Sequence, residues 1–338
     1  MPGDAPEVKL CRGGQGVELQ IGGLKFFFDP RSTPDEGVHC ISHAHSDHLP
    51  SATKKLEGRS IVCSPITATL ASNRLKRPLS KPILPSTHPD VELLNAGHIA
   101  GSNMFLVRGE KTVLYTGDMS TRDRFGMEGA RPIKTDVLII ESTYGDPSYR
   151  FPATENISRV IKDWIEDCLC SGYSTALFAY PLGKSQELIR MLSDFEPFIE
   201  GSVLECTRHI ESHGVEYCYR PFDAAEGQEK PCVMVCSTNS KSALKSRMRR
   251  GRLRTAAVSG WALSSSFKYQ MGVDEAFPFS DHADYDELMA FVKGCEPEVV
   301  YTHHGSADTL ASEIRRRLGI EAHSLLPGPK QSQLGDFK

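Results

Sequence analysis

The sequence predicts an α/β protein in which a β-rich first part precedes a region of alternating strands and helices. Residues 17–22 and 24–30 form two short runs of β-forming residues separated by glycine. Farther along, the strand-like segment 174–180 is followed by a helical segment at 183–192, which is the alternation of an α/β unit. The segment 135–143 contains a continuous apolar run at 137–140, as expected of a strand that is covered on both faces.

The other elements follow from apolar periodicity and from residues that cap helices. Ser64 followed by Pro65 predicts the start of a helix over 64–75. Apolar residues recur at helical spacing through 153–172, which ends at a glycine. The same criteria predict strands at 38–42, 104–109, 111–118 and 298–305, and helices at 285–294 and 307–319.

Composition excludes several classes of protein. The chain has 338 residues, of which 39% are hydrophobic and 24% charged, as in globular proteins of one large or two smaller domains. It contains no run of about eighteen apolar residues, and residues 1–10 are too polar for a signal peptide. Its ten cysteines are scattered without a CxxC pair, which is typical of core residues in a reducing compartment. We therefore expect a cytoplasmic protein with no contact to a membrane.

The charge distribution contains one basic segment. The formal net charge is −4, but the segment 241–254 has seven basic residues and no acidic one. Such a segment is usually a solvated face, and it is alternatively a surface that meets phosphates. The charge alone does not decide between these two interpretations.

A cluster of metal-ligand side chains follows the predicted strand at 38–42. The sequence HAHSDH at 43–48 places four imidazole or carboxylate groups within one loop, and these are the ligands that suit zinc. Three further ligand-type residues, each flanked by glycine, stand at predicted strand ends. Seven such groups exceed one tetrahedral site, which predicts two metal ions that share a carboxylate. The seven are His43, His45, Asp47, His48, His98, Asp118 and His304.

These motifs resemble the signature of the metallo-β-lactamase superfamily. Glu141 in DVLIIESTYG and His282 in FPFSDHAD are also similar to residues of its nucleic-acid-processing branch, the β-CASP nucleases. ESTYGDPSYRFP and SGWALSSS most resemble small ligase-associated DNA exonucleases and archaeal exonucleases similar to mRNA 3′-end processing factors. The resemblance covers nearly the whole chain. It implies a four-layer αββα sandwich with a shortened, inserted β-CASP-like α/β domain.

The resemblance also implies how the chain is divided and which residues hold zinc. The first part of the metallo-β-lactamase domain would be 1–151, the insert 152–277, the last part of the domain 278–327, and a polar tail 328–338. One Zn²⁺ would bind to His43, His45 and His98, and a second to Asp47, His48 and His304, with Asp118 bridging both. By alternation along its strand, His303 should point away from the metals.

The catalytic residues that the resemblance implies are Asp47, Glu141 and His282. Zinc would activate water and neutralise charge on phosphate, while His282, paired with Glu141, would protonate the leaving sugar oxygen. Substrate would be held by cationic and aromatic side chains. The candidates are Lys184, Arg247, Arg249 and Arg250 for phosphates, and Tyr144, Tyr149 and Phe151 for stacking on bases.

The function favoured is therefore a two-zinc nuclease, and more specifically a DNA exonuclease in repair or processing. An RNA-processing exonuclease or endonuclease is the main alternative. A small-molecule hydrolase is less favoured, because it would not need the insert, Glu141 or His282. A non-catalytic scaffold is disfavoured because every metal ligand is retained. The expected partner is nucleic acid, with a ligase or helicase as a further candidate.

Overall fold

The computed structural model describes the chain in two compact units. The first contains the chain up to Asp123, Met127–Arg150 and the chain from His282, and the second contains Arg124–Gly126 and Phe151–Asp281. The structure describes residues 6–11, 16–32, 36–51, 61–76, 79, 82–83, 89–222, 230–240, 244 and 252–325. Outside these ranges lie Arg247, Arg249, Arg250 and the tail expected at 328–338.

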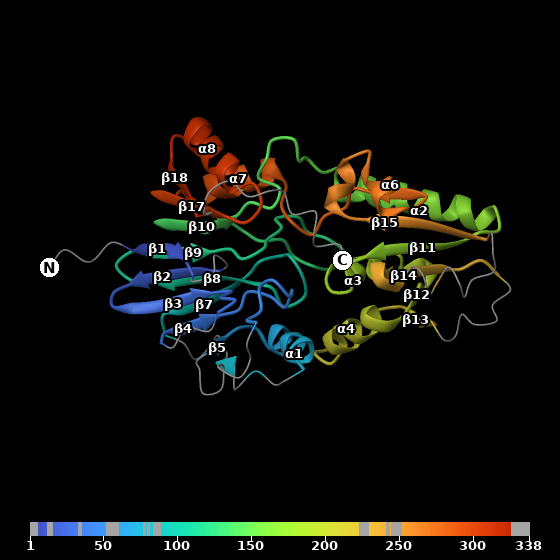
Figure 1. The fold of residues 1–338 in the computed structure, drawn as a ribbon, viewed down its shortest axis with the longest axis horizontal. Coiled ribbons are helices and arrows are strands. Elements are labelled where there is room, and N and C mark those ends of the chain that lie inside the picture. The colour runs from blue at the N-terminus through green and yellow to red at the C-terminus, as the bar shows by residue number, and fades with distance from the viewer. Residues whose placement is uncertain are drawn as a thin grey trace. The chain divides into compact units, whose positions relative to one another are not determined.

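Two six-stranded sheets form the first unit (Figure 1). One sheet contains, in spatial order, β1 (Glu7–Leu10), β2 (Val17–Ile21), β3 (Leu24–Phe28), β4 (Val38–Cys40), β5 (Ile61–Val62) and β6 (Pro82–Ile83). The other contains β18 (Glu321–Ser324), β17 (Val299–His303), β10 (Val137–Glu141), β9 (Thr112–Tyr115), β8 (Asn103–Arg108) and β7 (Val91–Asn95).

Strand β10 shows why the second sheet is apolar on both faces. Its odd-numbered residues Val137 and Ile139 pack with β2 and β3 in the core between the sheets. Its even-numbered residues Leu138 and Ile140 pack against the helices α7 (Tyr285–Cys295) and α8 (Ala307–Leu318). Because successive side chains of a strand point to opposite faces, the apolar run predicted this double burial.

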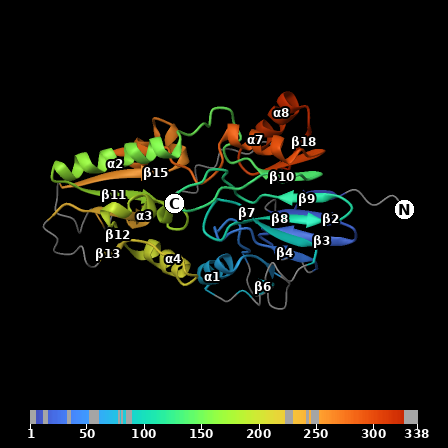
Figure 2. The same cartoon turned by 180° about the vertical axis from the view of Figure 1, so that it is seen from behind.

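The helices of the first unit lie on both sides of its sheets. Figures 1 and 2 show α7 and α8 on one side and α1 (Pro65–Arg74) on the opposite side. The N-terminus of α1 is capped as predicted, since the Ser64 side chain accepts a hydrogen bond from the amide of Thr67 at 3.0 Å. The predicted α/β fold with a layered αββα sandwich is therefore confirmed.

The second unit is a parallel sheet with helices, as the alternation of elements predicted. Apolar residues of α2 (Thr154–Cys170) at helical spacing, Ile157, Ile161 and Ile165, pack in the same core as Leu177. The sheet order is β13 (Arg220–Pro221), β12 (Phe198–Ile199), β14 (Val233–Ser237), β11 (Ser174–Ala179), β15 (Leu253–Val258) and β16 (Glu275–Phe277). Its other α-helices among the described residues are α3 (Lys184–Met191), α4 (Gly201–Glu211) and α6 (Phe267–Met271).

No helix among the described residues is both long and apolar enough to cross a bilayer.

Candidate metal centre and active site

Parallel strands bring the chemistry-bearing residues of the first unit to one edge of a sheet. β10 pairs in parallel with both β9 and β17, so the carboxyl ends of the three strands lie together. Asp118 follows β9, Glu141 is the last residue of β10, and His304 follows β17. In the facing sheet, β4 leads into the loop that carries His43.

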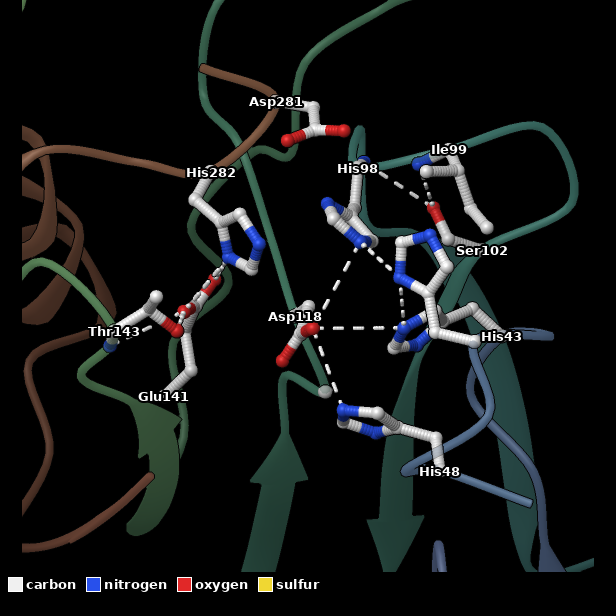
Figure 3. A network of polar contacts seen from close by, with 12 residues as sticks. His43, His48, His98, Ile99, Ser102, Asp118, Glu141, Thr143, Asp281 and His282 are labelled. Carbon is white, nitrogen blue, oxygen red and sulfur yellow. Dashed lines mark hydrogen bonds and ion pairs between the residues drawn. The ribbon is translucent and has the colours of Figure 1, made fainter. Parts of the chain in front are cut away.

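Three imidazoles and one carboxylate converge in this region (Figure 3). His45 Nδ1 is 3.0 Å from His43 Nε2 and 3.1 Å from His98 Nε2. Asp118 Oδ2 lies 3.5 Å from the same His43 nitrogen and 3.7 Å from that of His98. Ligands that share a tetrahedral zinc at about 2.0–2.1 Å are separated by roughly 3.3 Å. The spacing and the donor types therefore fit a zinc ion.

The remaining ligand candidates lie beside His48. His48 Nε2 is 3.3 Å from Asp118 Oδ2 and 3.6 Å from Asp47 Oδ2. The ring of His304 stacks on that of His48, with centroids 5.1 Å apart and planes at 19°. Asp118 thus contacts residues of both expected ligand sets, which is the place that a shared carboxylate would occupy.

Burial and charge prepare these groups to bind a cation. Burial of His43 holds its pKa well below the ordinary value, so the ring is in the neutral form that zinc requires. Burial would raise the pKa of Asp118, but the neighbouring imidazoles, His48 foremost, outweigh it and hold that pKa well below its ordinary value. His43 thus presents a neutral nitrogen and Asp118 an anionic oxygen. Burial lowers the pKa of His48, but Asp118, Asp47 and Asp29 outweigh it and raise that pKa well above its ordinary value, so His48 would release a proton on binding zinc.

Asp29 holds two of the expected metal-ligand histidines in place, and the sequence analysis missed it. It is 2% exposed, and its Oδ2 accepts hydrogen bonds from His48 Nδ1 at 2.9 Å, Ser42 Oγ at 2.6 Å and Tyr115 OH at 2.9 Å. Its Oδ1 accepts from the amide of Ser42 at 2.7 Å, and Ser42 Oγ lies 2.9 Å from His43 Nδ1. Asp29 therefore turns Nε2 of both histidines toward the ligand cluster, directly for His48 and through Ser42 for His43. A signal was present in FFFDP, where an acidic residue ends a buried strand.

Replacing Asp29 with asparagine should weaken metal binding without removing a ligand. A carboxylate accepts from four donors here, whereas an amide turns its NH₂ toward one of them in the place of Oδ1, or toward three in the place of Oδ2. We expect zinc affinity to fall by roughly 10–100-fold, the usual cost of losing an outer-shell partner of a ligating histidine. Competition with a fluorescent chelator measures this affinity.

Asp136→Asn is the matched control for this change. Asp136 likewise accepts from the amide and the hydroxyl of one residue, Thr112, at 2.6 and 2.8 Å, both on Oδ2, and it lies directly before β10, at the end of that strand away from Glu141. Equal losses of zinc affinity in the two variants would show that Asp29 acts only through general stability.

A carboxylate–imidazole pair lies next to the ligand cluster. His282 Nδ1 is 3.1 and 3.0 Å from the two carboxylate oxygens of Glu141, which is fully buried (Figure 3). Glu141 is fixed by the amide of Met119 at 2.6 Å and by Thr143 Oγ1 at 2.5 Å. The ring of His282 is 4.4 Å from that of His98. The pair can hold and deliver a proton beside the metal ligands.

His303 and His304 point in different directions. The His303 ring is 3% exposed and stacks on Tyr115 at 5.2 Å, within the core between the sheets. His304 has a positive φ of 61°, and Gly305 follows with a φ of 48°. A Cβ atom at Gly305 would lie 2.5 Å from the carbonyl oxygen of Ser142, so only glycine allows this close approach.

Three side chains that were expected to contact substrate are buried in the structure. Lys184 is 2% exposed, and its ammonium group pairs with Asp281 at 2.5 Å, so it is a buried structural cation. Tyr144 is 3% exposed, and its ring packs edge-on against Tyr149 and His282. Neither side chain presents a surface to a phosphate or a base. Phe151 is also buried, whereas Tyr149 is half-buried.

Comparisons with known proteins agree with this site. The family model described as "Zn-dependent metallo-hydrolase RNA specificity domain" matches residues 273–325. A probable DNA ligase of Opitutus terrae is 35% identical over 84% of this chain and 28% of that protein. The 5′ exonuclease Apollo of Danio rerio is 29% identical over 76% of this chain and 46% of that protein. Further curated relatives carry ribonuclease names. The chain spans between about a quarter and just over half of the length of the first relatives.

A solved structure extends the similarity to the fold. A protein of unknown function from Enterococcus faecalis superposes with a TM-score of 0.62 at 13% identity, over 96% of this chain and 97% of that one. Taken with the ligand cluster and the Glu141–His282 pair, these similarities mean that the chain belongs to the β-CASP branch of the metallo-β-lactamase superfamily.

Proposed function

We propose that this chain is a two-zinc nuclease that hydrolyses phosphodiester bonds, and that its preferred substrate is DNA attacked from an end. The observation that carries the proposal is the Glu141–His282 pair, which stands beside a metal-ligand cluster without belonging to the seven expected ligands. A phosphodiester needs such a proton donor because a sugar alkoxide is a poor leaving group.

The residues of the site divide into metal ligands and a proton donor. Zinc bound to the ligand set would activate water for attack on phosphorus and neutralise charge on the phosphate oxygens. Glu141 engages Nδ1 of His282 and stabilises the imidazolium, so Nε2 is the nitrogen that delivers the proton to the leaving oxygen. Met119 and Thr143 hold Glu141 in the orientation that this requires.

The names of the similar proteins support DNA and RNA as alternative substrates. The relative with 35% identity is named a probable DNA ligase, which supports DNA as the substrate, and Apollo is named a 5′ exonuclease, which supports attack from an end. The matching family model carries the words "RNA specificity", and this supports RNA as the second candidate substrate. A ligase or helicase remains a candidate partner for the DNA function.

A digestion experiment tests the proposed function. Purified, zinc-loaded protein is incubated with 5′- and 3′-labelled DNA and RNA, single- and double-stranded, and the products are resolved on a denaturing gel. We expect mononucleotides or a ladder from one end of DNA, and none after chelation. Faster cleavage of RNA would select the alternative, and inertness toward all eight substrates would refute a nuclease function.

The basic segment 241–254 is proposed to bind the phosphate backbone. Changing Arg247, Arg249 and Arg250 to glutamine should weaken binding to DNA of any sequence while leaving turnover at saturation nearly unchanged. Each lost contact should reduce the slope of log affinity against log salt by about 0.9 on duplex DNA or about 0.7 on single strands. Fluorescence anisotropy over a salt series measures the slope.

A charge-matched triple variant is the control for this experiment. Arg108, Arg316 and Arg317 are exposed and paired with carboxylates, so changing them to glutamine alters the net charge by the same amount. Equal slopes in the two triple variants would mean that the segment 241–254 is only a solvated face.

A further inference from the structure

Arg122 binds two carboxylates at the N-terminus of α7, those of Asp284 and Glu287, in an arrangement that we call the Arg122 fork. Its Nη2 is 2.8 Å from Asp284 Oδ2, and its Nε is 2.5 Å from Glu287 Oε1. The three side chains are between 7% and 20% exposed, so the ion pairs are largely shielded from solvent. Such charge-assisted bonds are stronger and more directional than those of exposed pairs.

The two carboxylates also cap α7, and they use their other oxygens to do so. Asp284 Oδ1 accepts from the amide of Glu287 at 3.0 Å, and Glu287 Oε2 accepts from the amide of Asp284 at 2.9 Å. This reciprocal capping box is complete without Arg122. A cation at a helix N-terminus is on the unfavourable end of the helix dipole. Capping and stabilisation of α7 therefore do not by themselves explain why an arginine lies at this position.

Arg122 projects from a loop that is fixed to the metal ligands. The loop begins directly after Asp118, and its Ser120 amide donates to the carbonyl of Ala96 at 3.0 Å, two residues before His98. Asp123 Oδ1 accepts from the Gly129 amide at 2.8 Å, which closes the loop. The guanidinium group of Arg122 is thus presented from a backbone whose position is set beside Asp118 and His98.

The start of α7 lies next to His282 in the chain. Asp284 is two residues after His282, and the intervening Ala283 donates its amide to the carbonyl of Met119 at 2.7 Å. Met119 in turn donates its own amide to Glu141 at 2.6 Å. The backbone contact and the Arg122 fork therefore join the same two loops, one that carries the shared metal ligand and one that carries the proton donor.

We propose that Arg122 is a positioning residue, which holds His282 beside Asp118 by clamping Asp284 and Glu287 to the metal-ligand loop. The role rests on the proposed function, in which His282 is the proton donor. Without the guanidinium, the carboxylates of Asp284 and Glu287 would repel each other, and the two segments would lose both charge-assisted bonds that Arg122 makes between them. His282 would then be displaced relative to the leaving oxygen.

Arg122→Gln should slow DNA hydrolysis at saturating substrate by roughly 10–100-fold, because displacement of a catalytic group by about 1 Å costs on this order. Zinc content should stay at the wild-type level. The loss should be much smaller on a nitrophenyl phosphodiester, whose leaving group departs without a proton. Arg122→Lys keeps the charge but loses the fork, so it should restore activity only in part.

Three further variants separate positioning from stability. Glu287→Gln keeps an acceptor for the capping box but removes one charge from the fork, so it should reproduce part of the loss. Arg150→Gln is the matched control, because Arg150 makes a two-bond pair with Asp286 on the first turn of α7, at 2.6 and 3.1 Å. It should leave hydrolysis unchanged. In a His282→Ala background, Arg122→Gln should cost nothing more.

A spectroscopic measurement tests the geometry independently of activity. Two-bond ¹H–¹⁵N correlation spectra of the zinc-loaded protein give the chemical shift of His282 Nδ1, which reports its hydrogen bond. The signals of this ring are assigned as those that disappear from the spectrum of His282→Ala. Arg122→Gln should shift this Nδ1 resonance, and Arg150→Gln should not. If the wild type cleaves no nucleic acid, the proposed function fails, and the spectra still decide whether Arg122 positions His282. An unshifted resonance, or an Arg122 effect that persists in the His282→Ala background, would overturn the proposal.

Discussion

Asp118→Ala should lose more zinc and more activity than the loss of any single histidine ligand. Asp118 Oδ2 lies 3.3 Å from His48 Nε2, 3.5 Å from His43 Nε2 and 3.7 Å from His98 Nε2, so it faces both expected ligand sets. Removing it takes away the anionic group that offsets the charge of two cations. We expect nuclease activity to fall by about 10³-fold or more, since metal catalysis supplies several kcal/mol of transition-state stabilisation.

Elemental analysis of the purified variants measures this loss directly. The wild type should contain about two zinc equivalents per chain, Asp118→Ala fewer than one, and His98→Ala an intermediate amount. His323→Ala is the control, because His323 is exposed and pairs only with Glu321 among the bonds described for its ring nitrogen. Fully active wild-type protein with one firmly bound metal would contradict the shared-ligand arrangement.

The cluster of ligand-type side chains could be predicted because most of the information is local. HAHSDH places four ligand groups in one loop, and a loop after a strand cannot spread them far apart. His98, Asp118 and His304 were identified by glycines at strand ends, where the backbone turns sharply. Parallel pairing of β9, β10 and β17 then brings these distant segments to one edge, whereas the apolar run of β10 indicated only that this strand is covered on both faces.

Residues whose role depends on tertiary contacts could not be predicted in the same way. Asp29 is separated from His48 by nineteen positions, and only the packing of β3 against β4 brings the two side chains together. Arg122 meets Glu287 across a separation of 165 positions. The basic residue after Gly183 suggested a phosphate contact, yet Lys184 is buried against Asp281, because α3 packs its first turn into the core of the second unit. The spacing of Gly183 and Lys184 can be seen in the sequence, but the burial of the Lys184 side chain cannot.

His282→Ala should slow nucleic-acid hydrolysis by roughly 10²–10⁴-fold, the usual contribution of a positioned proton donor. Zinc content should be unchanged, because His282 Nδ1 bonds to Glu141 and the ring is not one of the expected ligands. The deficit should shrink on a nitrophenyl phosphodiester, since nitrophenolate departs without a proton. Single-turnover assays on matched DNA and nitrophenyl substrates, with zinc measured in the same samples, give all three quantities.

Glu141→Gln should show the same leaving-group pattern with a smaller loss. Its amide keeps the shape of the side chain, but it removes the charge that stabilises the imidazolium of His282. Thr143→Val is a graded control, because it deletes one hydroxyl that fixes Glu141 and leaves the carboxylate in place. The expected order of losses on DNA is therefore His282→Ala, then Glu141→Gln, then Thr143→Val. If His282→Ala loses a zinc ion, or is equally slow on both kinds of substrate, then His282 is a metal ligand or a structural residue and the proposed proton transfer is wrong.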